Sequence, residues 1–341
     1  GETAEMLDIY QEGRGEVIFW IAAEAEKYQP PSWEEAERFH VVSVDGVGTK
    51  SILALESGLV GALPRDLVHH CVNDLLCTGA VPFGFDAYLG VHSSVSESTI
   101  QILQEGLIAA CQEQDVPFMG CFVEKRDDIY QPGRIDLIGM ICGEVPKEEV
   151  VTGSSIKPGD VLIGLPSSGL HTSGYSLARD IISWSKLGLL QTVESISGTI
   201  AEVFLRPHRS YREAIQKVKG EVKAVAHITG GGLYDNIERL LPVGCKAVIK
   251  ARNKNGRWLW PRPAEFAFID RIVEEQGKSL YRFDAQGRIE AFRVFNQGIG
   301  LVLVVSPENL RKVGRKLPEH YRIGKIVEAK GREVDVVYWP S

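Results

Sequence analysis

Short apolar segments alternate with amphipathic segments along this chain, and glycine-rich turns stand at several of the junctions between them. The apolar runs at 41–45, 83–90 and 161–166 predict buried strands. The periodic segments 66–78 and 97–114 predict helices with one apolar face. Because strands and helices alternate in both halves of the chain, we expect an α/β or α+β fold in which helices cover the faces of sheets.

The length of the chain and one polar stretch predict two domains. With 341 residues, the chain is long for a single hydrophobic core and sufficient for two. The polar stretch 146–160 lies between two apolar segments and has the composition of a domain boundary. We therefore expect an N-terminal domain at 1–148 and a C-terminal domain at 149–341.

The composition excludes several classes of protein. Apolar residues make up 44% of the chain and charged residues 24%, which is typical of a globular protein and not of a disordered one. No long uninterrupted apolar run occurs, so we expect no membrane partner. The net charge of −7, without a basic run, argues against a nucleic-acid partner and favours small-molecule ligands. The polar first residues and the six cysteines without a CxxC pair predict a cytoplasmic protein with free thiols.

The segment DGVGTK at 45–50 joins a predicted strand to a predicted helix. Glycines let backbone N–H groups approach an anion, and a helix N-terminus favours phosphate. Lys50 adds a positive charge, and Asp45 is placed to hold a divalent metal ion through oxygen. The segment lacks the spacing of a Walker A loop. A tight turn with a capping aspartate is the alternative interpretation.

Four polar residues of the predicted helix 66–78 lie on one helical face, namely Asp66, His70, Asn73 and Asp74. A solvent-exposed face is one explanation of this stripe. The helix follows the glycine-rich turn, however, so Asp74 could join Asp45 around one metal ion. Mg²⁺ typically binds one or two carboxylates together with ATP phosphates. We therefore expect Asp45 and Asp74 to lie close together.

Two further loops are rich in glycine and small polar residues. SSGLHTSGYS at 167–176 follows the strand at 161–166, and HITGGG at 227–232 precedes a predicted helix. Three consecutive glycines disfavour any regular structure, so close backbone contact with a ligand is the best reason for them. A plain polar loop and a flexible loop are the alternatives. We expect both loops, with Arg209 nearby, to bind the phosphate of a ribose or of ATP.

In this order the motifs resemble those of the phosphoribosylformylglycinamidine cyclo-ligase family, also called aminoimidazole ribonucleotide synthetase, of purine biosynthesis. The matching stretches span most of the chain and are VVSVDGVGTK (41–50), DLVHHCVNDLLCTGAVPFGFDAYL (66–89), IYQPGRIDLIGMICGEV (129–145), IKPGDVLIGLPSSGLHTSGYSLAR (156–179), HITGGGLYDNIERLLP (227–242), VFNQGIGLVLVV (294–305) and YRIGKIVEA (321–329).

The resemblance implies a two-domain α/β protomer whose sheet pairs with that of a second protomer in a homodimer. It implies a ligase that uses ATP and Mg²⁺ to close the ring of formylglycinamidine ribonucleotide, which gives aminoimidazole ribonucleotide, ADP and phosphate.

The motifs and the resemblance together predict roles for individual residues. Catalytic roles fall to Asp45, Lys50 and Asp74. Nucleotide or phosphate binding falls to Gly46, Gly48, Thr49, Asn73, Thr229, Gly230, Gly231 and Gly232. Substrate binding falls to Ser168, Gly169, His171, Arg209, Asn236 and Asn296. The predicted metal ligands are Asp45, Asp74 and Glu124.

One departure from the family pattern concerns an acidic motif. Family members usually carry GGETAEM where this chain has GCFVEKR at 120–126, and GETAEM stands at residues 1–6 instead. Phe122 offers no metal ligand, and the charge of Lys125 has the wrong sign. Glu124 could supply the missing carboxylate, and the alternative is Glu2 or Glu5 from the N-terminal segment.

Two smaller departures lie elsewhere. The family's AGVDI segment and GGFG loop are missing from residues 1–40, and Ser173 stands where an asparagine is expected. Because the departures at 1–40 and 120–126 bear on ATP and metal binding, a catalytically weak or inactive nucleotide-binding paralogue is the alternative function.

Overall fold

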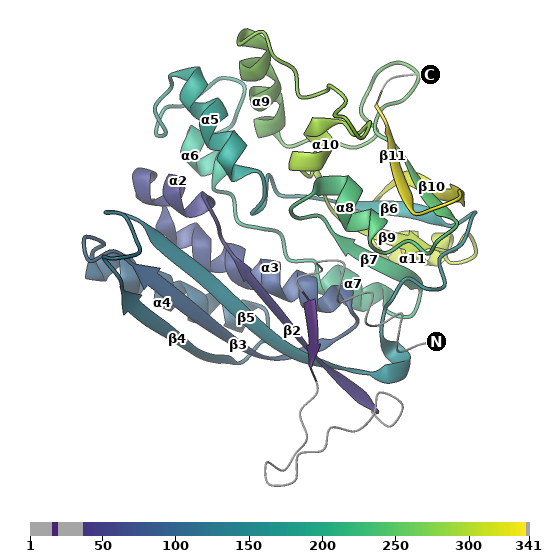
Figure 1. Ribbon diagram of the computed structural model, residues 1–341, viewed down its shortest axis with the longest axis horizontal. Helices are drawn as coiled ribbons and strands as arrows, with labels where there is room; N and C mark the ends of the chain where they lie inside the picture. The colour runs from purple at the N-terminus through teal and green to yellow at the C-terminus, as the bar shows by residue number, and fades with distance from the viewer. Residues whose placement is uncertain (1–15, 20–36, 339–341) are drawn as a thin grey trace.

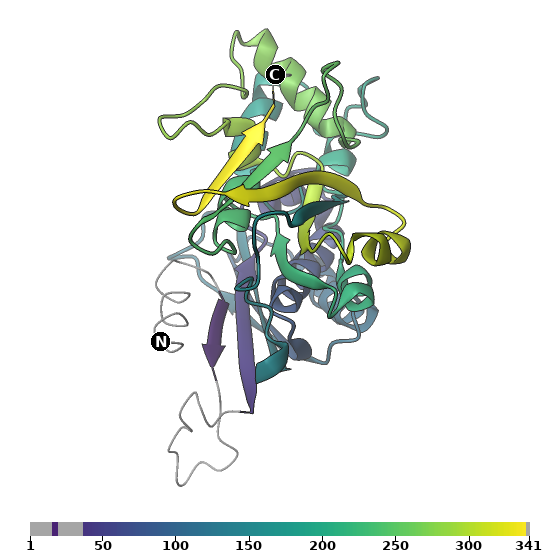
Figure 2. The same cartoon turned by 90° about the vertical axis from the view of Figure 1, so that its right-hand side faces the viewer.

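The computed structural model describes residues 16–19 and 37–338, which form two sheets with helices packed against them (Figure 1). The first sheet ends at Pro146, and the second begins at Val161. The two parts stack on one another, as the side view shows (Figure 2). Helix α3 (Leu63–Cys77) runs between them and contacts both. The fold is therefore mixed α/β with two mixed sheets, in agreement with the expected class.

The first sheet has the strand order β1-β2-β5-β3-β4. Its strands are β1 (Glu16–Phe19), β2 (Arg38–Gly46), β3 (Val81–Val91), β4 (Phe118–Lys125) and β5 (Ile135–Pro146). Strands β3 and β4 are parallel, and the other neighbours are antiparallel. Alternate residues of a strand face opposite sides of the sheet, so Val41 and Ile141 are buried in the core while Val44 and Met140 are exposed on the other face.

Helices α3 and α4 (Glu97–Glu113) cover the buried face of this sheet. A glycine of β5 allows α3 to come close, because a Cβ atom at Gly143 would lie 2.6 Å from the side chain of Leu75. Gly139, which pairs with Asp45 of β2, likewise leaves room for Leu67 of α3.

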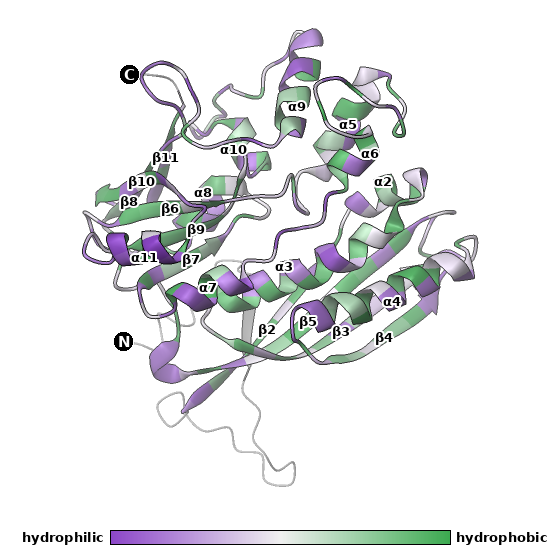
Figure 3. Cartoon of the chain, turned by 180° about the vertical axis from the view of Figure 1, so that it is seen from behind, coloured by the Kyte–Doolittle hydropathy of each residue, from purple (hydrophilic) through white to green (hydrophobic). Residues whose placement is uncertain are grey.

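The second sheet has the strand order β11-β8-β10-β6-β9-β7. Its strands are β6 (Val161–Pro166), β7 (Val222–His227), β8 (Cys245–Lys250), β9 (Ile299–Val305), β10 (Tyr321–Glu328) and β11 (Glu333–Val337). Strand β11 is parallel to β8, and the other neighbours are antiparallel. Strand β9 is buried on both faces, which explains its continuous apolar sequence IGLVLVV. The strands of both sheets are mostly apolar, in contrast with the outer surfaces of the helices (Figure 3).

Several shorter helices connect these strands. They are α2 (Lys50–Ser57), α5 (Tyr175–Ser185), α6 (Ile200–Phe204), α7 (Arg212–Val218), α8 (Gly232–Glu238), α9 (Ala264–Glu275), α10 (Glu290–Val294) and α11 (Leu310–Lys316). The helix predicted at 66–78 is α3, and it begins three residues earlier because its first turn accommodates Pro64.

An extended segment of the second domain, residues 206–211, is held against the first domain by buried side chains. Lys50 donates a hydrogen bond to the carbonyl oxygen of Arg206 over 2.9 Å. The Asp66 carboxylate accepts one from the main-chain N–H of His208 over 2.8 Å. Both side chains are wholly buried. The backbone groups of the segment are thus satisfied by the other domain.

Asn73 makes two further bonds to the same segment. Its side-chain amide donates to the carbonyl oxygen of Arg209 over 2.9 Å, and its side-chain oxygen accepts from the N–H of Tyr211 over 2.8 Å. Asn73 is also wholly buried. It therefore acts as a bridge between α3 and the second domain in this structure.

We predict that Asn73→Ala lowers the free energy of unfolding by about 2–4 kcal/mol, because two buried main-chain groups lose their partners. Urea denaturation of the variant and the wild type measures the difference. The matched control is Gln101→Ala, which removes an amide that bonds Glu105 on the exposed face of α4. Equal losses in the two variants would contradict the bridging role of Asn73.

Candidate functional site

Two carboxylates and one imidazole meet where β2 approaches α3. Asp45 lies near the end of β2, and His70 and Asp74 lie one turn apart on α3. The Nε2 atom of His70 is 2.8 Å from Asp45 Oδ2 and 3.1 Å from Asp74 Oδ2. Burial lowers the pKa of His70, but Asp74 and Asp45 outweigh it and raise that pKa to about 10. The structure thus brings Asp45 and Asp74 together, as their positions in the sequence predict.

Three more histidines lie next to this group and come from three different parts of the second domain. The Nδ1 atom of His227 is 2.6 Å from Asp74 Oδ1, and its Nε2 atom is 2.8 Å from His208 Nε2. The ring of His171 stacks on that of His208 with 3.9 Å between centroids. Burial lowers the pKa of all three imidazoles. Asp74 has its pKa held well below the usual range, because His70 and His227 outweigh the effect of burial.

These contacts bring the two predicted ligand loops together. His171 belongs to the loop at 167–174, and His227 directly precedes the loop at 228–232. Both meet at His208, which lies in the 206–211 segment. The two loops therefore share one polar region between the domains.

Lys50 uses all three N–H bonds of its ammonium group within the protein. It donates to Asp66 Oδ1 over 2.7 Å and to the carbonyl oxygens of His171 and Arg206, each over 2.9 Å. Burial lowers the pKa of Lys50 and raises that of Asp66 to about 6. In this structure Lys50 fixes the 167–174 loop and the 206–211 segment to α2. Its catalytic role stays a prediction.

Three other predicted site residues hold the loops in shape. Asn296 accepts from Ser167 Oγ over 3.0 Å and donates to the carbonyl oxygen of Gly169 over 2.8 Å. Asn236 donates to the carbonyl oxygens of Gly230 and Gly232 over 3.0 and 2.8 Å and accepts from Thr229 Oγ1 over 3.2 Å. Ser168 Oγ donates to the carbonyl oxygen of Pro207 over 2.7 Å.

The predicted glycines leave the backbone of two turns accessible to a ligand. Among the described residues, no atom lies within 4 Å of the Cβ position at Gly48 or Gly230, and both glycines are exposed. Gly231 and Gly232 have φ values of 86° and 61°, which favour glycine. The turns at 46–49 and 229–232 are thus the parts of the site that a ligand could approach through the backbone.

The remaining predicted side chains lie at the margin of the site. Thr49 Oγ1 is 3.4 Å from Ser176 Oγ in the second domain. The N–H of Gly46 donates to Asp45 Oδ1 over 2.9 Å. Arg209 is half-exposed and forms an ion pair with Glu319 over 3.0 Å.

The structure does not bring Glu124 to the two aspartates within one protomer. Strands β5 and β3 separate β4 from β2, so Glu124 is roughly 14 Å from Asp45 across the sheet. It also faces the opposite side of the sheet, where it accepts a hydrogen bond from Tyr88 over 3.1 Å. The three predicted metal ligands are therefore not gathered in one place within the described chain. Glu2 and Glu5 lie outside the described residues.

Three residues of the region were not expected from the sequence. His208 and Thr172 complete the histidine group, since Thr172 Oγ1 is 2.9 Å from His70 Nδ1. Glu265, in the first turn of α9, is wholly buried beside Gly169, and Arg206 Nη1 lies 3.5 Å from its carboxylate. Burial raises the pKa of Glu265 to about 7. The sequence has no local signal for these residues, because their partners are distant along the chain.

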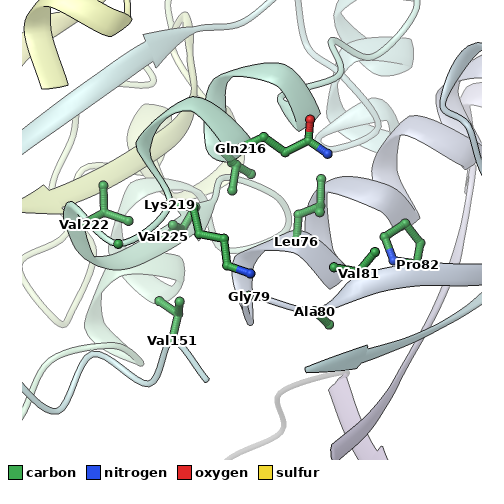
Figure 4. A pocket seen from close by; sticks show the side chains of 12 residues that line it. Leu76, Gly79, Ala80, Val81, Pro82, Val151, Gln216, Lys219, Val222 and Val225 are labelled. Atoms are coloured by element: carbon green, nitrogen blue, oxygen red, sulfur yellow. The ribbon is translucent and has the colours of Figure 1, made fainter. Parts of the chain in front are cut away.

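A cavity of about 60 Å³ also lies between the domains, at the C-terminal end of α3 (Figure 4). Its walls include Leu76, Val81 and Val225 and are mainly apolar. The predicted site residues are not among the 12 residues that line it. The polar region around Asp45 and Asp74 is therefore the stronger candidate for a site.

The fold and the site define a class of two-domain α/β proteins with carboxylates and glycine-rich turns at the domain junction. The chain belongs to the AIR synthase related protein family. The model of the family's N-terminal domain matches residues 33–145, and the model of its C-terminal domain matches residues 157–337.

Curated relatives resemble the chain over most of its length. The phosphoribosylformylglycinamidine cyclo-ligase of Synechococcus sp. (strain JA-2-3B'a(2-13)) is 34% identical, over 100% of this chain and 92% of the relative. That of Staphylococcus carnosus (strain TM300) is 36% identical, over 86% of this chain and 81% of the relative. The chloroplastic/mitochondrial cyclo-ligase of Vigna unguiculata is 36% identical, over 86% and 73%.

Solved structures share the fold at low sequence identity. The thiamine monophosphate kinase of Aquifex aeolicus superposes with a TM-score of 0.57 at 15% identity and covers 98% of this chain and 96% of its own. The hydrogenase maturation protein HypE in complex with ATP superposes with a TM-score of 0.56 at 14% identity and covers 92% and 84%. These likenesses show the fold alone. Within the described part of the chain, the helices are too short or too polar to cross a membrane.

We predict that Glu265→Gln makes the protein more stable at pH 8 than the wild type, with little difference at pH 5. The folded-state pKa of Glu265 is about 7, above the ordinary value of 4.5, so the native state prefers the protonated acid. Stability from this group is complete below pH 4.5 and is lost as the pH rises through 7. The loss amounts to about 3.5 kcal/mol at most, at about 1.4 kcal/mol per pKa unit.

Melting temperatures of both proteins between pH 5 and pH 8 test this prediction. The control is Glu194→Gln at an exposed position, which we expect to change the profile little. A Glu265→Gln profile parallel to that of the wild type would contradict the assignment.

Proposed function

We propose that the protein catalyses the ATP-dependent ring closure of formylglycinamidine ribonucleotide to aminoimidazole ribonucleotide, with release of ADP and phosphate. The observation that carries the proposal is the 34% identity to a cyclo-ligase over 100% of this chain. The division into domains 1–148 and 149–341 is part of the same proposal, since β5 ends at Pro146 and β6 begins at Val161.

The reaction needs positioning and charge neutralisation more than a protein nucleophile. ATP transfers its terminal phosphoryl group to the formyl oxygen, the amidine nitrogen attacks the activated carbon, and phosphate leaves with that oxygen. We assign Asp45 and Asp74 to hold a divalent ion, which neutralises charge on the ATP phosphates when it is bound. Two carboxylates suit Mg²⁺, the ion expected from the sequence. The open turns around Gly48 and Gly230 suit the phosphates themselves.

The other predicted residues act in two ways in this proposal. Gly169, His171 and Arg209 face the ribonucleotide from the 167–174 loop and its neighbourhood. The buried side chains act by holding that loop and its partners in place, which their hydrogen bonds support. This second set comprises Lys50, Asn73, Asn236 and Asn296.

An assay of the purified chain with ATP, Mg²⁺ and formylglycinamidine ribonucleotide tests the function. We expect substrate-dependent release of ADP and formation of aminoimidazole ribonucleotide. Binding of ATP without turnover would favour the alternative function, an inactive nucleotide-binding paralogue, which the departure from the family pattern at 120–126 suggested.

We predict that Asp45→Asn lowers turnover by about 100-fold or more, because the variant loses a carboxylate that holds the ion that neutralises the reacting phosphates. Asp45 is partly exposed at a strand end, so the melting temperature should change little. The control is Asp180→Asn on the exposed side of α5, which should keep full activity. Intact turnover with a large fall in melting temperature would show that Asp45 is only structural.

We also propose that the protein is a homodimer in which the open faces of the first sheets meet. The residues on this face include Val44, Met140 and Phe122, with exposed fractions of 52%, 39% and 66%. They come from β2, β5 and β4, so the apolar surface extends across the sheet. Exposed apolar side chains gathered on one open face of a sheet are typical of a protein interface.

We predict that Met140→Lys converts the dimer to a monomer, because an unpaired charge would be buried in the interface. Size-exclusion chromatography with light scattering measures the change. The control is Leu190→Lys, at an exposed loop position of the second domain with an exposed fraction of 66%. A wild-type monomer, or a Met140→Lys dimer, would refute this assembly.

A further inference from the structure

The arrangement around His70 is unusual for a pair of carboxylates that binds Mg²⁺. Its Nε2 atom lies between Asp45 Oδ2 and Asp74 Oδ2, at 2.8 and 3.1 Å. His70 and Asp74 are almost fully buried. An imidazole nitrogen is therefore part of the donor set, whereas Mg²⁺ prefers oxygen ligands.

The two carboxylate contacts of the His70 Nε2 atom do not have the direction of hydrogen bonds. Among the described residues, the buried Nε2 atom has no partner of acceptable hydrogen-bond geometry, although both oxygens are close. A proton on this nitrogen would thus point between the two carboxylates. A metal ion has no such need, because each ligand directs its own lone pair at the ion. Ligands at about 2.1 Å from an ion lie about 3 Å apart when their bonds are at right angles, which matches these separations.

The neighbours of His70 and Asp74 favour metal binding by these two side chains. Thr172 Oγ1 lies 2.9 Å from His70 Nδ1, so Nδ1 can keep a proton and donate it to the hydroxyl group while a bound ion displaces the proton from Nε2. The ring of His227 contacts Asp74 Oδ1 over 2.6 Å and fixes that carboxylate. Partners of this kind orient metal ligands and raise their affinity for the ion.

We propose that Asp45, His70 and Asp74 bind a divalent first-row transition ion, such as Mn²⁺ or Co²⁺, in preference to Mg²⁺. One imidazole nitrogen and two carboxylates suit these ions, and affinity for such sites rises along the series from Mn²⁺ towards Cu²⁺. The proposal concerns the ion at the site assigned above. It is tested by binding alone, so its failure leaves the proposed reaction standing.

Among the described residues, two groups of three side chains have possible ligand atoms within 4.8 Å of one another: His70, Asp74 and His227 form the first, and His171, His208 and His227 form the second. The geometry of the second group is less suitable. The rings of His171 and His208 are stacked with an angle of 22° between their planes, so their in-plane lone pairs run side by side and do not converge. The Nε2 atom of His171 already accepts a hydrogen bond from the N–H of Ser168 over 3.1 Å. We therefore place the ion at His70.

The test is titration of the chelator-treated full chain with Co²⁺, Mn²⁺ or Mg²⁺, without ATP or substrate. Visible absorption follows Co²⁺, and calorimetry follows all three ions. We expect one Co²⁺ per chain, bound on the order of 100-fold more tightly than Mg²⁺. His70→Ala should weaken Co²⁺ binding about 10-fold or more and change Mg²⁺ binding little. The control is His320→Ala, because that partly buried histidine lies outside the group.

Asp45→Asn provides a second variant if His70→Ala does not fold, and it should weaken Co²⁺ binding as well. Equal affinities for Co²⁺ and Mg²⁺ in the wild type would overturn the proposal. Unchanged Co²⁺ binding in His70→Ala would also overturn the proposal. If only Asp45→Asn folds, unchanged Co²⁺ binding in that variant would overturn it. Co²⁺ binding that survives in His70→Ala but is lost in His208→Ala would place the ion in the other histidine group and would also overturn it.

Discussion

The hydrogen bonds between α3 and the backbone of residues 206–211 are the constraint on which the site depends. This segment joins no sheet, so its buried main-chain groups need other partners, and each unpaired group would cost about 1–3 kcal/mol. Asp66 and Asn73 on α3, with Lys50 on α2, supply those partners. The same interaction carries His208 to the histidines of both glycine-rich loops. The hydrogen bonds that join the two domains are thus the same bonds that assemble the site.

The polar stripe of α3 shows what the sequence could and could not predict. Its spacing correctly placed Asp66, His70, Asn73 and Asp74 on one face, and the strand and helix patterns gave the fold class. The surroundings of that face were not predictable, since Asn73 contacts a residue 138 positions away. A solvent-exposed face and an interdomain face have the same sequence pattern. For the same reason Lys50 was expected to direct its positive charge at an anion, although its three N–H donors all bond to groups of the protein.

Glu124 and Glu265 illustrate two other limits. Glu124 was predicted as a metal ligand from its place in a motif, but only the sheet order and the two-residue period of β4 determine where its side chain points. Glu265 carries no motif, and its burial depends on the fit between α9 and the loop around Gly169. The short strand β7 was not predicted, because six residues beside a glycine run have little periodicity.

Val44 and Asp45 are neighbours in β2, yet they face opposite sides of the first sheet. One side carries the carboxylate proposed to hold the metal ion, and the other carries the exposed apolar residues. Insertion or deletion of one residue earlier in β2 would exchange them, which would put a carboxylate on the apolar surface and a valine beside His70. Evolution can therefore vary the residues of this strand separately, but it cannot insert or delete a single residue within the strand without altering both surfaces at once.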